Sequence, residues 1–301
     1  MRRSSNPPSR VVRARRGLRT RLADIWGYRE LLAGLVRKEL KVKYKNSSLG
    51  FLWSLVNPLL YLLVFSIAFQ VILRAGIPSF PVYLLSGLLV WNLFSSGVTA
   101  GTASVVVNAS LVKKVWFPRE ILVLASIGSA LVNFFLQMGV LIAFLAVIRY
   151  EVAYSYLPLV IPALIVVVTL TSAVALLLAA VNVYLRDTQH FLELALLAWF
   201  WVTPIVYPFM LMGGREEKWQ AAVYMTNPVT AIVLVFQRTF YAKVDVAAVG
   251  DRFGGVDQIL PGWSMGGYAA YLGAVAAVSV LLLLFSLWIF GRLEGNFAEE
   301  L

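Results

Sequence analysis

Long uninterrupted apolar runs alternate with short charged or polar connections along most of the chain. A bilayer core of about 30 Å needs roughly 20 residues of helix at 1.5 Å per residue. Backbone groups in lipid must satisfy one another's hydrogen bonds, so apolar runs of this length are predicted to be helices. Six runs are long enough, and each is bounded by charge, glycine or proline: residues 52–73, 82–107, 121–148, 157–184, 191–212 and 268–290.

The segment before the first apolar run has a different pattern. In residues 24–51, Leu31, Leu35 and their neighbours first fall near one helical face while charged residues lie largely elsewhere. This predicts an amphipathic helix on the inner membrane surface. Residues 40–45 alternate strictly, so helix and extended strand both remain open there. Residues 1–23, rich in arginine, are predicted to form a disordered basic arm.

The connection between the fifth and sixth runs is unusually long and partly apolar. Its apolar piece, residues 229–236, is too short to cross a bilayer. We expect short external gate helices over about 218–241, interrupted at Asn227-Pro228 and dipping into the membrane. The predicted fold is therefore an all-α integral membrane protein with six transmembrane helices in residues 52–301, an N-terminal interfacial helix and external re-entrant helices.

Composition and charge agree with a membrane protein and give its orientation. The chain is 60% hydrophobic and only 14% charged, whereas soluble domains carry about 25% charged residues. Of the 26 lysines and arginines, nineteen fall on the side of the two termini. This bias predicts that both termini are cytoplasmic. The net charge of +11 is thus interpreted as a topology signal that also attracts anionic lipid, not as a nucleic-acid site.

Several kinds of chemistry are excluded by the residues themselves. The chain has no cysteine and one histidine, so thiol catalysis and multi-histidine metal sites are excluded. It has no GxxxxGK[ST] phosphate loop, and no carboxylate pair suited to acid–base catalysis stands near a membrane face. We therefore expect neither an enzyme nor a metal site or cofactor in this chain.

Aromatic and weakly polar residues are concentrated in three of the expected spans. Either they form an interfacial belt with ordinary packing, or they line a pathway along which sugar rings slide over aromatic faces. The second interpretation gives a set of candidate pathway residues: Tyr61, Phe65, Phe69, Trp91, Phe94, Trp199, Trp201 and Tyr207.

Several stretches resemble one transporter family in order along the chain. They are LKVKYKNSSLGFLWSLVNPLLYLLVF, LVKKVWFPREILVLASI, VNVYLRDTQHFLELALLAWFWVTPIVYP, MTNPVTAIVLVFQRTFY and FGRLEGNFAEEL. The set resembles the ATP-binding-cassette permeases of the type-2 class that export O-antigen, teichoic acid or galactan. The resemblance covers about residues 25–301.

The resemblance implies a homodimer in the cytoplasmic membrane of a bacterium, with one ATPase subunit under each copy. ATP and Mg would bind to that partner, and the substrate would be a polysaccharide on an undecaprenyl-pyrophosphate-type lipid. A coupling helix is implied around residues 113–119. In that loop apolar residues stand between positive charges, so we predict that the ATPase contact includes Lys114, Trp116, Phe117 and Arg119.

The lysines before the first span then gain a second candidate role. Lys41, Lys43 and Lys45 can attract the pyrophosphate head group, because ammonium groups suit phosphate oxygens. They share one side only if the segment is extended, and the alternative is anchoring alone. Two other functions stay open: an exporter of drugs or simple lipids with the same architecture, and an integral membrane glycosyltransferase.

Overall fold

The computed structural model describes residues 18–45, 50, 53–72, 77–209, 224–244 and 258–301. Every regular element among these residues is a helix, which confirms the all-α prediction for the described part of the chain. The predicted basic arm (1–23) and the first half of the predicted gate region (218–241) lie largely outside the described residues.

The helices follow the predicted runs closely in position. In chain order they are α1 (Leu18–Gly27), α2 (Arg29–Tyr44), α3 (Trp53–Ser66) with its π-helical continuation η2 (Ile67–Ile72), α4 (Phe80–Val107), α5 (Ala109–Lys114), α6 (Glu120–Val147), η3 (Tyr154–Leu159), α7 (Val160–Tyr184), α8 (Thr188–Val202), α11 (Pro228–Phe240), α12 (Met265–Leu293), η5 (Glu294–Asn296) and α13 (Phe297–Glu300).

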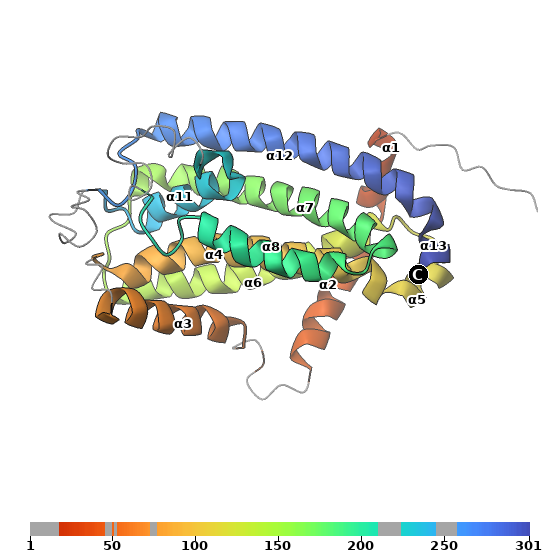
Figure 1. Ribbon diagram of the computed structural model, residues 1–301, viewed down its shortest axis with the longest axis horizontal. Coiled ribbons are helices and arrows are strands. Elements are labelled where there is room, and N and C mark those ends of the chain that lie inside the picture. Colours follow the sequence, from red (N-terminus) through yellow and green to blue (C-terminus); the bar gives the residue numbers. More distant parts are fainter. Residues whose placement is uncertain (1–17, 46–49, 51–52, 73–76, 210–223, 245–257) are drawn as a thin grey trace, which may run out of the picture.

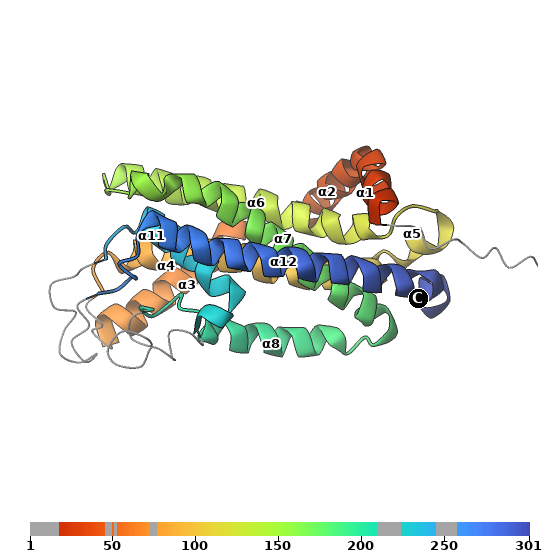
Figure 2. The same cartoon turned by 90° about the horizontal axis from the view of Figure 1, so that it is seen from above.

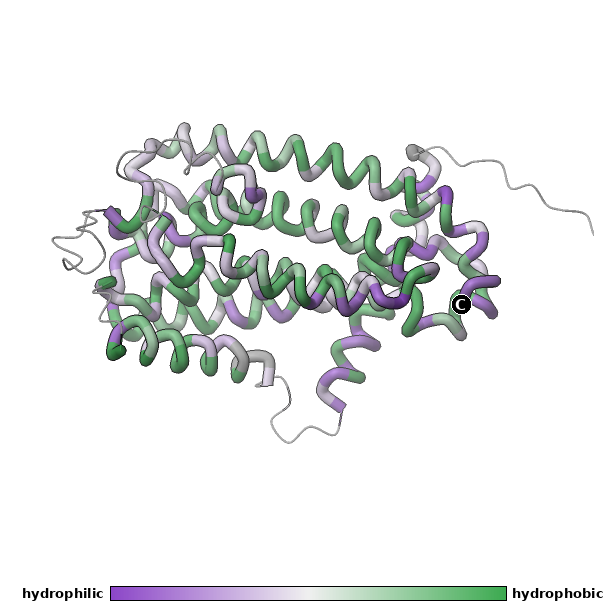
Figure 3. Tube along the Cα trace, viewed as in Figure 1, coloured by the Kyte–Doolittle hydropathy of each residue, from purple (hydrophilic) through white to green (hydrophobic). Residues whose placement is uncertain are grey.

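Four long helices, α4, α6, α7 and α12, run lengthwise along the bundle (Figure 1). We call the end where α1, α5 and α13 lie the basal end, and the opposite end the distal end. The first described residue and the C-terminus both lie at the basal end in two perpendicular views (Figures 1 and 2). Hydrophobic residues dominate the long helices, whereas α2 and the basal end carry many hydrophilic ones (Figure 3).

Only part of the expected span count is supported. Four described helices are long and apolar enough to cross a membrane: Phe80–Val107, Glu120–Val147, Tyr154–Tyr184 and Met265–Glu300. The first expected span corresponds to α3 and η2, and the fifth to α8, which has 15 residues. A helix of that length reaches only about 22 Å. The count of six spans therefore stays a prediction.

Glycine allows the two central helices to approach closely. A Cβ atom on Gly97 would lie 2.6 Å from Thr171 Cγ2, and one on Gly101 would lie 2.8 Å from Ala175 Cβ. Larger residues would push α4 and α7 apart, which is the use that membrane helices make of small-xxx-small pairs.

The predicted interfacial segment is helical through Tyr44. The helix thus includes residues 40–44, for which the sequence pattern allowed either helix or strand. Its helix packs on α6: Leu35 is buried, and Val36 fits against Gly128. Near its end, the Tyr44 hydroxyl donates to Asn133 Oδ1 at 2.7 Å. These contacts along α6 explain why residues 40–44 form a helix and not a strand, despite their alternating pattern. The helical region also begins earlier than residue 24, at Leu18.

The short helix α11 is enclosed by longer helices, and most of its side chains are buried. It begins at Pro228, where the sequence places a break. Asn227 caps it by accepting a hydrogen bond from the Val229 N–H at 3.0 Å. Proline at the first helical position costs no backbone hydrogen bond. The described contacts do not show how deep this helix lies in the membrane, so its re-entrant character stays a prediction.

Candidate functional site

Most of the predicted pathway residues meet in one continuous group of rings, which we call the aromatic wall. It joins α3 and η2 to α4 and α8, and its members are Tyr61, Phe65, Phe69, Trp91, Phe94, Trp199, Phe200 and Trp201. Phe200 lies at its centre, with ring centroids 6.3 Å from Tyr61, 6.0 Å from Phe65 and 5.5 Å from Trp91.

Burial separates the wall into a supported edge and an accessible edge. Phe94 is fully buried, and Trp91 and Phe200 are nearly so. Tyr61 is 44% exposed and Trp201 is 50% exposed. Tyr61 and Trp201 are therefore the most accessible rings of the wall, and the buried Phe200 packs against both of them.

A hydrogen-bonded asparagine connects the wall to α11. Trp199 Nε1 donates to Asn227 Oδ1 at 2.9 Å, and Asn227 Nδ2 donates to Thr203 Oγ1 at 2.9 Å. Asn227 is also the cap of α11. A movement of α11 would thus displace the end of α8, where Trp201 of the exposed edge lies.

Tyr207 does not stack within the wall but supports it. Its hydroxyl donates to the Trp201 carbonyl at 2.7 Å. Its own carbonyl accepts from the Tyr83 hydroxyl at 2.7 Å. Tyr207 thus fixes the irregular segment that follows α8 against the last turn of that helix, which carries Trp201.

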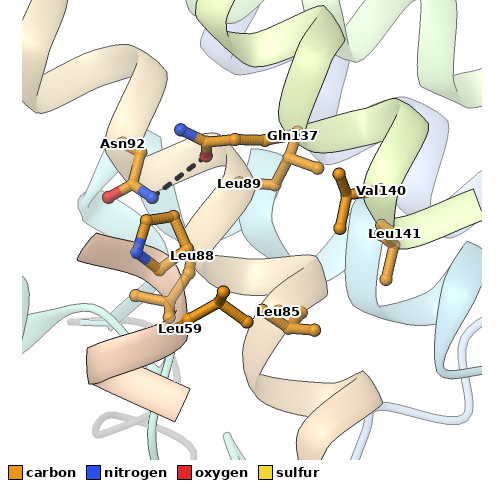
Figure 4. Close-up of a pocket in the computed structure, with 9 residues that line it drawn as sticks. Leu59, Leu85, Leu88, Leu89, Asn92, Gln137, Val140 and Leu141 are labelled. Atoms are coloured by element: carbon orange, nitrogen blue, oxygen red, sulfur yellow. Dashed lines mark hydrogen bonds between the residues drawn. The ribbon is translucent and has the colours of Figure 1, made fainter. Parts of the chain in front are cut away.

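An apolar cleft lies between α3, α4 and α6 (Figure 4). Its walls are mainly leucine side chains, among them Leu59 and Leu88. At one side Asn92 Nδ2 donates to Gln137 Oε1 at 3.2 Å. The lining carries no charged group, so the cleft is unsuited to a phosphate head group.

The three candidate lysines are all exposed, at the end of α2. Because α2 stays helical through Tyr44, residues two positions apart are rotated by about 200° around the helix axis and point to nearly opposite sides. Lys43 therefore does not share a side with Lys41, and the single-sided arrangement that an extended strand would give is absent. Lys45, the C-cap residue, follows Lys41 by one turn. The Lys43 ammonium lies 5.7 Å from the centre of the Tyr44 ring.

Acidic and basic groups on α2 are in partly desolvated positions. The Ser126 hydroxyl donates to Glu39 Oε1 at 2.9 Å. Burial nevertheless raises the pKa of the Glu39 carboxyl above its ordinary value. Partial desolvation beside the bundle also lowers the pKa of the Lys43 amine, although much of this residue's surface stays exposed. The end of α2 is thus set against the bundle and is not a freely solvated arm.

The loop at residues 113–119 is divided between surface and interior. Lys114 is exposed, Val115 is 54% exposed and Trp116 is 46% exposed. Phe117 is instead only 4% exposed and packs in the buried apolar cluster at the basal end, which we call the basal core and which includes Ile121, Phe290 and Phe297. In this structure Lys114 and Trp116 offer surface to a partner, whereas Phe117 contributes by fixing the loop.

Arg119 and a group of residues absent from the sequence predictions meet behind this loop. Arg119 Nη1 donates to the Glu294 carbonyl, and its guanidinium lies 5.5 Å from the centre of the Phe297 ring. Arg21 forms ion pairs with Glu120 and Glu294. The sequence offered no signal for these pairs, because Arg21 stands in an arginine-rich stretch and its partners are far away along the chain.

Comparison with protein families gives one match. The family model described as "ABC-2 type transporter" matches residues 30–241. The match includes α2, the aromatic wall, the loop at 113–119 and α11, and ends before α12.

Curated relatives cover more of the chain. An O-antigen export system permease protein RfbA from Myxococcus xanthus is 32% identical over 283 residues, covering 92% of this chain and 98% of the relative. A protein of the same name from Klebsiella pneumoniae is 30% identical over 211 residues, covering 70% and 80%. The polysialic acid transport protein KpsM from Escherichia coli is 23% identical over 206 residues, covering 66% and 76%.

Proposed function

Because the chain belongs to the ABC-2 type transporter family, we propose that it is the permease subunit of an ATP-driven exporter that moves a lipid-linked polysaccharide across the cytoplasmic membrane. The relative from Myxococcus xanthus, similar over nearly its whole length, is named as an O-antigen export permease. In this proposal two copies of the chain assemble with two ATPase subunits, which bind ATP and Mg. The basal end faces the cytoplasm.

The aromatic wall is the structural feature that best supports a polysaccharide as the substrate. Its exposed edge, Tyr61 and Trp201, offers flat apolar faces with no charged group among the wall's own side chains. Aromatic faces accept the C–H face of a sugar ring, and a weak contact repeated over several rings lets a long polymer slide. The buried rings behind this edge keep the faces preorganised, which lowers the entropy cost of each contact.

The end of α2 is suited to the lipid head group. The Tyr44–Asn133 hydrogen bond sets it about 20 Å along α6 from Glu120 at 1.5 Å per residue. Because α6 is about 42 Å long, it exceeds a bilayer core of about 30 Å by about 12 Å. If Val147 marks the outer boundary, the end of α2 stands about 8 Å inside the inner one, a depth from which long basic side chains extend to the head groups.

The export activity is tested by reconstitution of the chain and its ATPase in vesicles that contain lipid-linked polysaccharide. Polymer should become accessible to a glycosidase added outside only when ATP is enclosed in the vesicles, on the side of the ATPase. A complex that hydrolyses ATP and moves a dye or a simple phospholipid but not the polymer would refute the polysaccharide assignment and favour an exporter of small amphiphiles.

Removal of the lysine charges should separate head-group binding from membrane anchoring. The triple change Lys41→Gln, Lys43→Gln and Lys45→Gln should leave insertion and basal ATP hydrolysis intact, because eleven other basic residues precede the first span. Export should fall at least tenfold. As Lys41 and Lys45 lie one turn apart, their single variants should cost more than Lys43→Gln.

The matched control removes three arginines from the N-terminal arm, Arg10, Arg13 and Arg15, each changed to glutamine. It alters the net charge equally, so it reports on anchoring. Normal export by the inserted lysine variant would reduce these lysines to membrane anchors.

Contact with the ATPase is tested at the loop surface. The chain has no cysteine, so a single Val115→Cys variant carries one thiol, on a residue that is 54% exposed. A bifunctional reagent should crosslink it to the ATPase, and the assembled complex should shield it from a bulky maleimide. A cysteine at Glu151, an exposed residue in the connection between α6 and α7, serves as the control. Equal labelling of both in the full complex would place the ATPase contact elsewhere.

A further inference from the structure

One guanidinium at the basal end holds together three segments that are distant in the sequence. Arg21 of α1 donates from Nη1 to Glu120 Oε1 at 3.0 Å and from Nη2 to Glu294 Oε1 at 2.8 Å. Nη1 also approaches the Leu287 carbonyl of α12 at 3.4 Å. The N-terminal helix, the start of α6 and the end of α12 thus share one cation.

This cluster is largely withdrawn from solvent. The exposed fraction of the side chain is 13% for Arg21, 3% for Glu120 and 29% for Glu294. A buried ion pair holds its geometry only while each charge keeps its partners. The absence of a side chain at Gly291 also matters, because a Cβ atom there would overlap the Arg21 guanidinium.

The same end of α12 is bound a second time, by the loop proposed to dock the ATPase. Arg119 donates to the Glu294 carbonyl and covers the Phe297 ring. Phe297 is fully buried and packs edge-on against Phe290 with ring centroids 5.3 Å apart. The Tyr184 hydroxyl donates to the Leu293 carbonyl at 2.9 Å, which adds the end of α7.

Two of the three acid–base partners lie outside the part of the chain that matches the family model. That match spans residues 30–241, whereas Arg21 and Glu294 lie before and after it. Only Glu120 lies inside, directly after the loop at 113–119. The contacts therefore join two segments outside the matched residues to the loop that the family model includes.

We propose that Arg21 is a positioning residue that couples the ATPase-docking loop to α12. A displacement of the loop then moves α6 directly and α12 through the Arg21 and Arg119 contacts at Glu294. Since α12 packs along α7 and runs to the distal end (Figure 1), the displacement reaches the helices around α11. The inference rests on the proposed function, because it assumes an ATPase at the loop.

The test measures polymer exported per ATP hydrolysed by the reconstituted complex. Arg21→Gln should keep ATPase binding and basal hydrolysis but lower this ratio about tenfold. Arg21→Lys keeps the positive charge but cannot donate to two carboxylates with the fixed geometry of a guanidinium, so it should give an intermediate ratio. Because Arg21 acts through Glu120, adding Glu120→Gln to Arg21→Gln should cause little further loss.

Glu294→Gln keeps the experiment decisive if Arg21→Gln fails to assemble, because Glu294 is the most exposed member of the cluster. It should also lower the ratio, by a smaller factor. Arg29→Gln, at an exposed position on α2, is the matched control and should leave the ratio unchanged.

The wild-type arm reports on the proposed function alone, because a wild-type complex that exports no polymer refutes that function. An unchanged ratio in Glu294→Gln and Arg21→Lys, with wild-type export intact, overturns the positioning role. Equal loss of hydrolysis and export in both variants, with a normal assembly, would also overturn it, since the polymer exported per ATP would then be unchanged and the defect would lie in hydrolysis and not in coupling.

Discussion

At the basal end, two arginines bind carboxylates and carbonyls at the ends of helices, with the Tyr184 hydroxyl beside them. At the distal end three tyrosine hydroxyls donate to carbonyls, beside one arginine, Arg238, which donates to the Ala242 carbonyl. Tyr83 donates to the Tyr207 carbonyl at 2.7 Å, and Tyr150 donates to the Tyr241 carbonyl at 2.9 Å. Tyr268 donates to the Pro261 carbonyl at 2.8 Å. Each of these carbonyls belongs to an irregular segment or a helix end.

The difference follows from what each end must satisfy. Irregular backbone inside a membrane bundle leaves carbonyls without partners, and an unsatisfied buried carbonyl is costly. A phenol supplies a donor without bringing a charge out of water. The basal cluster can use charges because Glu294 remains 29% exposed. Among the described residues, ion pairs are thus found where a soluble partner is proposed to bind, whereas three of the four donors named at the distal end are neutral phenols.

The largest expected effect comes from reversing a charge in the basal cluster. Glu120→Lys would place a third cation beside Arg21 and Arg119, and it removes the partner of a largely buried guanidinium. The loss should be about 3–5 kcal/mol in the free energy of unfolding. Fluorescence-detected thermal unfolding in detergent measures it as a large fall in Tm.

The control for this change is Glu193→Lys, an identical reversal at an exposed position of α8. Its effect should stay within about 0.5 kcal/mol. A Tm fall of the same size in both variants would mean that the basal cluster is no more than surface charge.

The sequence predicted the long helices well because their signal is local. The run at 82–107 became α4, and the run at 121–148 became α6, with ends shifted by at most two residues. The break before Pro228 was also predictable, because proline has no amide hydrogen to donate. Aromatic content along three spans was enough to nominate residues that the structure brings together.

The remaining features depend on contacts between distant segments. Arg21 and Glu120 are 99 positions apart, and no periodicity relates them. Phe117 has the same local pattern as its exposed neighbour Trp116, yet packing in the basal core buries it. The conformation of residues 40–44 was left open because the alternating pattern hides the contacts with α6 that favour a helix.

A smaller effect is expected where the distal end loses one neutral donor. Tyr83→Phe removes the hydroxyl from a fully buried ring and leaves the Tyr207 carbonyl without that donor. The expected loss is about 1–3 kcal/mol. Tyr61→Phe is the control, because the Tyr61 side chain is 44% exposed. Thermal unfolding of the two variants should differ by several degrees, and identical curves would contradict the importance of tyrosine donors at this end.

The smallest change in stability, paired with a clear change in export, is expected at the exposed edge of the aromatic wall. The Trp201 ring stacks edge-on with Phe65 and Phe200, at centroid distances of 6.2 Å and 5.6 Å. Such aromatic pairs contribute about 0.5–1.5 kcal/mol beyond area burial. Burial against lipid adds little, since lipid tails are as apolar as the side chain. Trp201→Ala should therefore lower the free energy of unfolding by only about 0.5–1.5 kcal/mol.

Export by Trp201→Ala should nevertheless fall several-fold, because one face offered to the sugar rings is lost, and Trp201→Phe should restore most of it. Phe285→Ala is the matched control: its side chain is also 50% exposed and stacks on Trp288, with ring centroids 6.0 Å apart, but it lies on α12 away from the wall. Polymer release per ATP from reconstituted vesicles measures all three. Equal export by the two alanine variants would assign the wall to packing, and the distal end would then differ from the basal end in chemistry alone and not in its role.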